Sequence, residues 1–141
     1  FIGISPHTTR AELQRAVFEG LAFAIVDALQ GYPQGGELYL TGGGAASATW
    51  LQIIADCTGR TVVSSAFNEL SARGAAILAA RSVAALAETP PLAQTRYQPR
   101  PQAHARYAAL YPVYRLLREQ MLPVWQARQA ALQPLSQDVQ P

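Results

Sequence analysis

The sequence predicts an α/β domain, rich in helix and with a few strands. Half of its 141 residues are apolar and 14% are charged, which is typical of a globular chain with a core. Segments with helical periodicity alternate with short apolar or β-branched segments, and glycine or proline separates them. This alternation of helix and strand is typical of the α/β class.

The first element is an amphipathic helix. Thr8 or Thr9 can cap its N-terminus, Glu12 falls in its first turn, and the pattern continues to about Gln30. Apolar and small residues recur at helical spacing and predict its inner face. This face comprises Leu13, Ala16, Val17, Gly20, Leu21, Ala24 and Ile25.

The middle of the chain contains shorter elements, separated by breakers. Gly59 follows a segment with helical periodicity and is expected to end it as a left-handed cap. In chain order we expect a strand at 37–41, a helix at 47–58, a strand at 61–63 and an alanine-rich helix at 71–86.

The last part of the chain carries most of the positive charge. The sequence has five arginines against seven acids up to Glu88, and six arginines against two acids after it. Together with several aromatic residues, this tail suggests a nucleic-acid surface. The aromatic and aliphatic residues, however, follow a three-four spacing that favours a packing helix after a proline-bearing linker. The stripe comprises Tyr107, Leu110, Tyr111, Tyr114, Leu117, Met121, Val124 and Trp125.

The stretch "YLTGGGAAS" at residues 39–47 is the main functional signal. A strand, a glycine turn and a helix start together expose backbone N–H groups that can bind an anion or lie against a ring. A Walker phosphate loop requires a lysine, and this chain has none. A dinucleotide fingerprint fits poorly, because Ser47 takes its last position and Ser64 follows the next strand instead of an acid. A turn that serves only close packing remains an alternative.

Several separated motifs resemble the C-terminal half of the FGGY carbohydrate kinases. Motifs in the first helix (Gly3–Ile4, Glu12–Leu13 and 16–20) and in the tail at 97–117 also agree with that family, closest to its xylulokinase-type branch. The matching residues around the glycines are Gly42, Gly43, Gly44, Ala45, Trp50, Gln52, Ala55, Asp56, Gly59, Glu69, Ala72, Gly74, Ala75 and Ala76.

This resemblance implies the C-terminal lobe of the actin-like ATPase (ribonuclease H-like) fold. Residues 1–90 would form its nucleotide-binding part, and residues 91–141 the linker and terminal packing helix. The N-terminal sugar-binding lobe would lie outside this chain, which we interpret as a piece of a longer protein. The implied activity is transfer of the γ-phosphate of ATP to a hydroxyl of a sugar or polyol, such as xylulose or a related pentulose. A non-catalytic actin-like domain used for packing or partner binding is the alternative.

The resemblance also implies a site. Gly43 and Gly44 would lie against the adenosine and α-phosphate of ATP, with Gly42 and Ala45 in the same turn. Ser47 takes the position where many relatives carry an asparagine that hydrogen-bonds the nucleotide. No residue of this chain is expected to be catalytic or to bind a metal. Mg²⁺ would be held mainly by residues elsewhere, and the chain alone is expected to be inactive.

The remaining expectations concern partners and scaffold. We expect ATP and a small sugar or polyol as ligands, no nucleic acid, no membrane, a cytoplasmic location and a homodimer. Gly74, Ala75 and Ala76 are expected to pack a helix near the nucleotide loop. Glu69 should cap that helix, with orientation of the loop behind the adenine as the alternative. Asp56 should bond locally, and Arg15 should pair with Glu19. His7 and His104 are expected at the surface or in loops.

Overall fold

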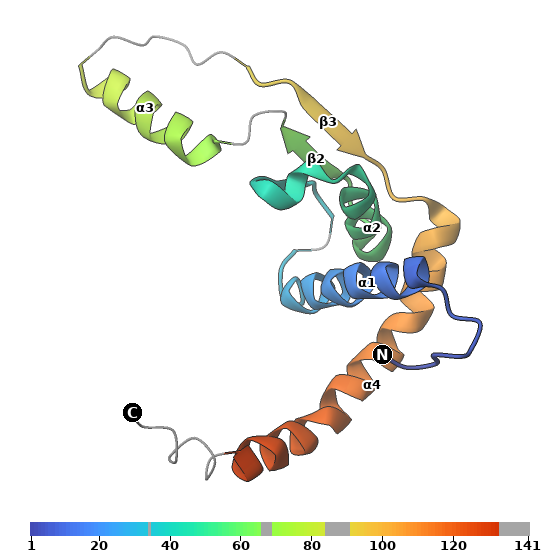
Figure 1. Cartoon of the computed structure of the whole chain (residues 1–141). Helices are drawn as coiled ribbons and strands as arrows, with labels where there is room; N and C mark the ends of the chain where they lie inside the picture. The colour runs from blue at the N-terminus through green and yellow to red at the C-terminus, as the bar shows by residue number, and fades with distance from the viewer. Residues whose placement is uncertain (34, 66–68, 84–90, 133–141) are drawn as a thin grey trace.

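The computed structural model describes residues 1–33, 35–65, 69–83 and 91–132. Figure 1 shows the elements in chain order, from blue to red. They are α1 (Arg10–Ala28), β1 (Leu38–Leu40), a 3₁₀ turn η1 (Gly43–Ala46), α2 (Ala48–Thr58), β2 (Val62–Ser65), α3 (Leu70–Ser82), β3 (Gln94–Tyr97) and α4 (Pro101–Leu132).

The strands form one small sheet in the order β1-β2-β3. β1 runs parallel to β2, with Leu38 opposite Val62, and α2 connects the two as a crossover helix. β3 runs antiparallel to β2, with Tyr97 opposite Val62. The β1–α2–β2 unit confirms the predicted alternation, and β3 was not predicted because it lies in the expected linker.

The core lies between α2, the sheet and parts of α1 and α4. Ile54 and Val62 are fully buried at its centre. Phe23 of α1 meets Tyr107 of α4 edge to face, with their ring centroids 5.9 Å apart. Because α2 presents apolar residues on several sides, it is the central helix of the described structure.

Helix α1 begins as predicted but presents a different face to the core. Thr9 is its N-cap, and its side chain and that of Glu12 form a reciprocal capping box. The predicted inner face is only partly right, because Ile25 packs against the core whereas Val17 and Leu21 are 49% and 53% exposed. The buried residues of this helix are Ala22 and Phe23, since α1 meets α2 and α4 along a neighbouring stripe.

Helix α4 bears out only half of the predicted apolar stripe. Tyr107 is buried, and Tyr111 and Tyr114 pack partly against the core. The second half of the helix projects away from the body (Figure 1), so Met121 and Trp125 are exposed, which contradicts the prediction for them. None of the described helices combines the length and the apolarity that a membrane span requires.

Helix α3 stands apart from the rest of the described structure (Figure 1) and buries none of its residues. The predicted close packing at Gly74 is therefore wrong, because a Cβ there would meet no atom of the described part of the chain within 4 Å. Glu69 takes the N-cap position, yet its side chain makes no capping hydrogen bond, so that prediction is wrong too. The expected end of this helix at residues 84–86 lies outside the described residues.

Candidate functional site

The glycine turn follows the C-terminal end of β1, at the edge of the sheet where the parallel strands β1 and β2 end. Gly42 has φ +85° and ψ −171°, a backbone conformation that only glycine adopts readily. The chain then forms η1, and Ser64 at the end of β2 donates its hydroxyl to the carbonyl of Ala45 at 3.4 Å. In open α/β sheets, ligands bind beyond the carboxyl ends of the strands, which is where this turn lies.

The next two glycines are not required by the fold itself. Gly43 and Gly44 do not have positive φ, and both are exposed. Among the described residues, a Cβ at Gly43 would meet no atom within 4 Å, and one at Gly44 would meet only the indole of Trp50, at 3.6 Å, an ordinary contact. Bare backbone at these positions therefore leaves surface that another molecule can approach.

The backbone N–H groups of the same two glycines start a helical turn. The first N–H groups of any helix lack an intrahelical acceptor. Among the described residues, no acceptor takes the N–H of Gly43 or Gly44, whereas that of Ala45 is bound by the carbonyl of Gly42 at 3.0 Å. The turn thus offers donors to a ligand on its outer side.

Ser47 links the turn to α2 and already has a structural role. It is the N-cap of α2, and its Oγ accepts the backbone N–H of Trp50 at 3.3 Å. Its hydroxyl hydrogen can still be donated, because the cap uses only an oxygen lone pair. The predicted site residues Gly42, Gly43, Gly44, Ala45 and Ser47 therefore form one continuous turn, with Ser47 shared between it and the helix.

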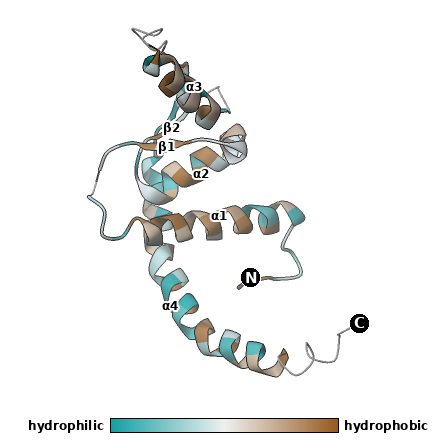
Figure 2. Cartoon of the chain, turned by 90° about the vertical axis from the view of Figure 1, so that its left-hand side faces the viewer, coloured by the Kyte–Doolittle hydropathy of each residue, from teal (hydrophilic) through white to brown (hydrophobic). Residues whose placement is uncertain are grey.

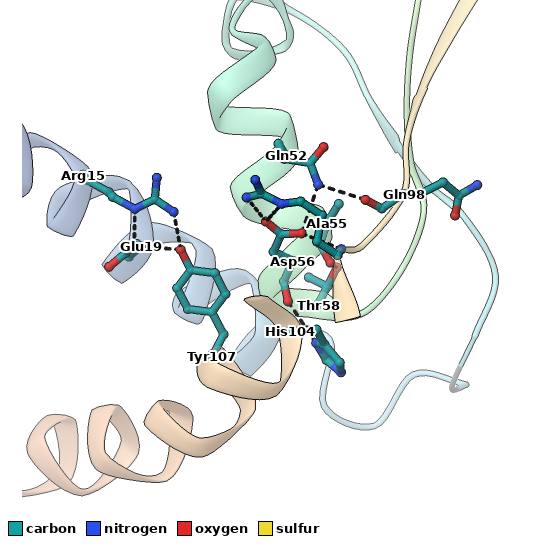
Figure 3. A network of polar contacts seen from close by, with 10 residues as sticks. Arg15, Glu19, Gln52, Ala55, Asp56, Thr58, Gln98, His104 and Tyr107 are labelled. Carbon is teal, nitrogen blue, oxygen red and sulfur yellow. Dashed lines mark hydrogen bonds and ion pairs between the residues drawn. The ribbon is translucent and has the colours of Figure 1, made fainter. Parts of the chain in front are cut away.

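A buried polar network holds the other end of α2 (Figure 3). Asp56 is fully buried and accepts the backbone N–H of Arg100 at 2.8 Å, which secures the first turn of α4. Gln52 donates to the same oxygen, Oδ1, at 3.0 Å, and the other oxygen, Oδ2, accepts Nε of Arg100 at 3.0 Å. The expected local bonding is confirmed only for Gln52, four residues away, because the main partner, Arg100, lies 44 residues away.

These hydrogen bonds determine the charge state of Asp56. Burial raises the pKa of this carboxyl, but the hydrogen bonds from Arg100 and Gln52 outweigh that effect and leave its pKa below the ordinary value. Asp56 is therefore ionised, and partners within the chain, not a ligand, hydrogen-bond its carboxylate.

His104 joins the same network and was wrongly expected at the surface. Its Nδ1–H donates to the carbonyl of Asp56 at 2.9 Å. Its ring lies over Gly59, where a Cβ would stand 2.6 Å from the ring. Gly59 also has φ +68° and is the left-handed cap of α2, as predicted.

A third cluster connects α1 to α4 (Figure 3). Arg15 pairs with Glu19 at 2.7 Å, as predicted, and Tyr107 donates its hydroxyl to Glu19 at 2.7 Å. Burial and Glu19 raise the pKa of Tyr107 to about 12. Burial likewise raises the pKa of the Cys57 thiol to about 12, which makes it unreactive at neutral pH.

Two open pockets lie beside these clusters. One of about 360 Å³ is lined by residues that include Arg15, Thr49 and Arg100, and one of about 450 Å³ by residues that include Arg106 and Tyr107. Neither includes a residue of the glycine turn. Two of the charged groups that line them are paired within the chain, since Arg15 binds Glu19 and Arg100 binds Asp56.

The sequence alone did not reveal the partners of Asp56 and Tyr107. Both pairings join residues far apart in the chain, Arg100 with Asp56 and Tyr107 with Glu19. The only available signal was an acid near the C-terminus of an apolar helix, where it opposes the helix dipole and therefore requires a partner.

Comparisons with known proteins agree with this fold. Residues 1–83 match the family described as "FGGY family of carbohydrate kinases, C-terminal domain". A probable L-xylulose kinase from Pasteurella multocida is 33% identical over 122 residues, which cover 83% of this chain and 25% of that protein. A glycerol kinase from Koribacter versatilis is 36% identical over 109 residues, which cover 70% of this chain and 22% of that protein.

A solved structure supports the same assignment. A xylulose kinase from Rhodospirillum rubrum superimposes with a TM-score of 0.71 and 28% identity, covering 89% of this chain and 28% of that one. The predicted fold class, a C-terminal lobe of the actin-like ATPase fold, is confirmed. The chain spans about a quarter of the length of the curated relatives it matches.

Proposed function

The chain belongs to the FGGY family of carbohydrate kinases, as part of its C-terminal domain, and from this premise we propose that it supplies the adenosine side of an ATP site. The parent reaction is transfer of the γ-phosphate of ATP to a hydroxyl of a sugar or polyol. Relatives named for L-xylulose and for glycerol support this substrate class, and we propose a pentulose such as xylulose as the acceptor. The comparisons offer no support for a domain that serves packing alone.

One observation carries the proposal: the fold does not require glycine at 43 or 44. Neither glycine has a positive φ, and no close neighbour among the described residues explains the missing side chains. A nucleoside that lies against the backbone does explain them, because a Cβ would occupy its space. The donors of the turn then face the α-phosphate, and the hydroxyl of Ser47 can donate to the nucleotide.

The chemistry assigned to this chain is binding and orientation of ATP. Phosphoryl transfer depends on positioning of the nucleotide, neutralisation of charge by Mg²⁺ and a base for the acceptor hydroxyl. The described residues contain no cluster of three or more His, Cys, Asp or Glu side chains that could hold a metal. We therefore assign the ligands of Mg²⁺ and the base to the remainder of the kinase.

A titration of the isolated chain with ATP tests the site. We expect the backbone amide signals of Gly43 and Gly44 to shift in NMR spectra, with a saturating dependence on ATP concentration. Gly44→Val should abolish these shifts while the other signals of the chain stay in place. Shifts confined to residues around Arg15 and Arg100, with none in the turn, would contradict the proposal.

We also propose that the arginine-rich end does not bind nucleic acid. Arg96 pairs with Glu37, Arg100 with Asp56 and Arg118 with Asp27, so much of this charge is neutralised within the chain. Binding to duplex or single-stranded nucleic acid that weakens steeply with salt would contradict this.

Three further properties are part of the proposal. The exposed apolar residues of the second half of α4, which include Met121, Leu122 and Trp125, support a homodimer through this helix. Light scattering of the purified protein tests this homodimer.

The use of ATP, together with a single free and buried Cys57, supports a cytoplasmic location. Residues 1–90 form the nucleotide-binding part, and residues 91–141 the linker and packing helix of the same lobe.

A further inference from the structure

The indole of Trp50, in the first turn of α2, lies beside the glycine turn. A Cβ at Gly44 would stand 3.6 Å from its Nε1 and 3.8 Å from its Cδ1, so the N–H edge of the indole faces this glycine. Ser47 caps the backbone N–H of Trp50 at 3.3 Å and thereby fixes the start of α2 behind the turn. An atom that lies against Gly44 on this side is therefore also close to the indole N–H.

Neighbouring groups hold this indole in place. Phe18 of α1 lies against it, with the ring centroids 5.5 Å apart and the ring planes at 39°. The indole is partly buried and also packs against the core. Figure 2 shows α1 and α2 side by side, with apolar residues, in brown, on both helices. Because the ring is packed between α1 and the core, the direction of its N–H is set before any ligand arrives.

The indole N–H of Trp50 is an unused donor. This group can only donate a hydrogen bond, and no acceptor among the described residues takes it. Within the described part of the chain, no buried side-chain nitrogen or oxygen lacks a partner. Since Nε1 of Trp50 has no partner, it is not buried, and it reaches the surface at the edge beside Gly44. A packed tryptophan usually pairs this N–H, so an open one beside a proposed ligand site indicates a contact for the ligand.

We propose that Trp50 is a further binding residue of the nucleotide site, and that its indole N–H donates a hydrogen bond to the nucleoside of ATP, at a ribose oxygen or a purine nitrogen. In the proposed site the backbone N–H groups of Gly43 and Gly44 face the α-phosphate. The indole edge is then a donor for the nucleoside that lies against Gly44. Because a hydrogen bond is directional, this contact orients the nucleoside along the turn. The inference rests on the proposed function, because it requires a nucleotide at this turn.

A purely structural role for Trp50 leads to a different expectation. The contact with Phe18 uses only the ring, so Trp50→Phe keeps a ring against α1 and removes the N–H. The chain contains one other tryptophan, Trp125, which is exposed on α4 and lies outside the turn. The same substitution at Trp125 is therefore a matched control.

The test is an NMR titration of the isolated chain with ATP and, separately, with adenosine. The two tryptophans give two indole N–H signals, and Trp125→Phe assigns the remaining signal to Trp50. We expect the Trp50 signal to shift with the same saturation curve as the Gly44 amide for either ligand, while the Trp125 signal stays in place. Trp50→Phe should weaken binding of both ligands about two- to twelvefold, and Trp125→Phe should leave it unchanged. The thermal midpoint without ligand checks that both variants are folded.

A Trp50 indole signal that stays in place while the Gly44 amide shifts would overturn the inference and leave the nucleotide site intact. Unchanged affinity in a folded Trp50→Phe would also overturn it, since the ring alone would then suffice. A Trp50 shift with ATP, but none with adenosine at concentrations that saturate the Gly44 shift, would overturn it in favour of a phosphate contact. The shift is measured in the unmodified chain, so it decides the question even where Trp50→Phe fails to fold. A Gly44 amide that does not respond to ATP overturns the proposed function and this inference together, so the two failures are distinguishable.

Discussion

The two ends of helix α2 carry glycines for different reasons. At its C-terminus, Gly59 has φ +68°, and the ring of His104 occupies the place where a side chain would begin. At the turn before its N-terminus, Gly43 and Gly44 have ordinary backbone angles and open surroundings. The first end is explained by contacts within the chain. For the second end, we propose that the glycines leave room for a bound nucleotide.

This difference separates structural glycines from functional ones. A glycine that the fold requires should affect stability when it is replaced, whereas a glycine reserved for a ligand should affect binding alone. Gly42 belongs to the structural kind, because its φ of +85° requires glycine although it lies in the same turn. Position in a motif therefore does not decide the role of a glycine.

The largest effect is expected at the C-terminal end of α2. Gly59→Val should lower the free energy of unfolding by about 3 kcal/mol, because a β-branched residue is strained in the left-handed region and its Cβ overlaps His104. Urea denaturation of the isolated chain measures this change.

A double-mutant cycle sharpens this result. Combining Gly59→Ala with His104→Ala should cost less than the sum of the single changes, because the smaller side chain removes the overlap. Additive costs would mean that backbone strain alone explains Gly59.

The next largest effect is expected at Asp56. Asp56→Asn should lower the free energy of unfolding by about 2 kcal/mol, because charge-assisted bonds to Arg100 at a fully buried site are lost. Denaturation curves measure the change, and Glu69→Gln, at an exposed residue without a capping bond, is the control. A cost equal to that of the control would contradict the structural role of the network.

The pH dependence follows from the lowered pKa of Asp56. A carboxyl with a lower pKa in the folded state stabilises the fold above its unfolded pKa, about 3.9, and loses this contribution as the pH falls through its folded pKa. The difference in stability between the parent chain and Asp56→Asn should therefore shrink below about pH 4. Glu12, whose pKa is also lowered, is present in both proteins and cancels. A difference that stays constant down to pH 2 would count against this assignment.

The smallest effects are expected at Ser47, which belongs to both the helix and the turn. Ser47→Ala should cost about 1 kcal/mol of stability, because the cap on Trp50 is lost. Ser47→Gly should cost only a few tenths. Both should weaken ATP binding about two- to twelvefold, since both lack the hydroxyl. Denaturation and ATP titration separate the two roles, and unchanged ATP affinity in Ser47→Gly would limit Ser47 to the cap.

Local patterns predicted the elements well. Thr9 with Glu12 at the start of α1, and Gly59 after α2, mark helix ends by short-range chemistry, and the structure agrees. Strand β3 was missed because Gln94–Tyr97 is polar, lies among prolines and pairs with β2 only at one edge of the sheet. This segment forms a strand because it pairs with β2, and the local sequence carries no information on that pairing.

The errors in the core have the same origin. The apolar residues of α1 occupy more than one stripe, so periodicity alone could not tell that Phe23 faces the core while Val17 does not. Likewise, Met121 and Trp125 continue the helical spacing of Tyr107. They are nevertheless exposed, because the second half of α4 projects away from the core. The glycine turn itself was predictable, because strand, glycines and helix start are contiguous.

A chimeric kinase, in which this chain replaces the matching quarter of the Pasteurella multocida protein, provides the most direct test of the central proposal, that Gly44 is reserved for the nucleotide. Gly44→Val should raise the KM for ATP at least roughly tenfold and leave the KM for the sugar within about twofold, because the new methyl groups occupy nucleoside space. Its thermal midpoint without nucleotide should match that of the parent, because the added Cβ makes only an ordinary contact with Trp50. A variant that folds normally and keeps the parent's KM for ATP would contradict the claim and reduce the glycines to a packing turn.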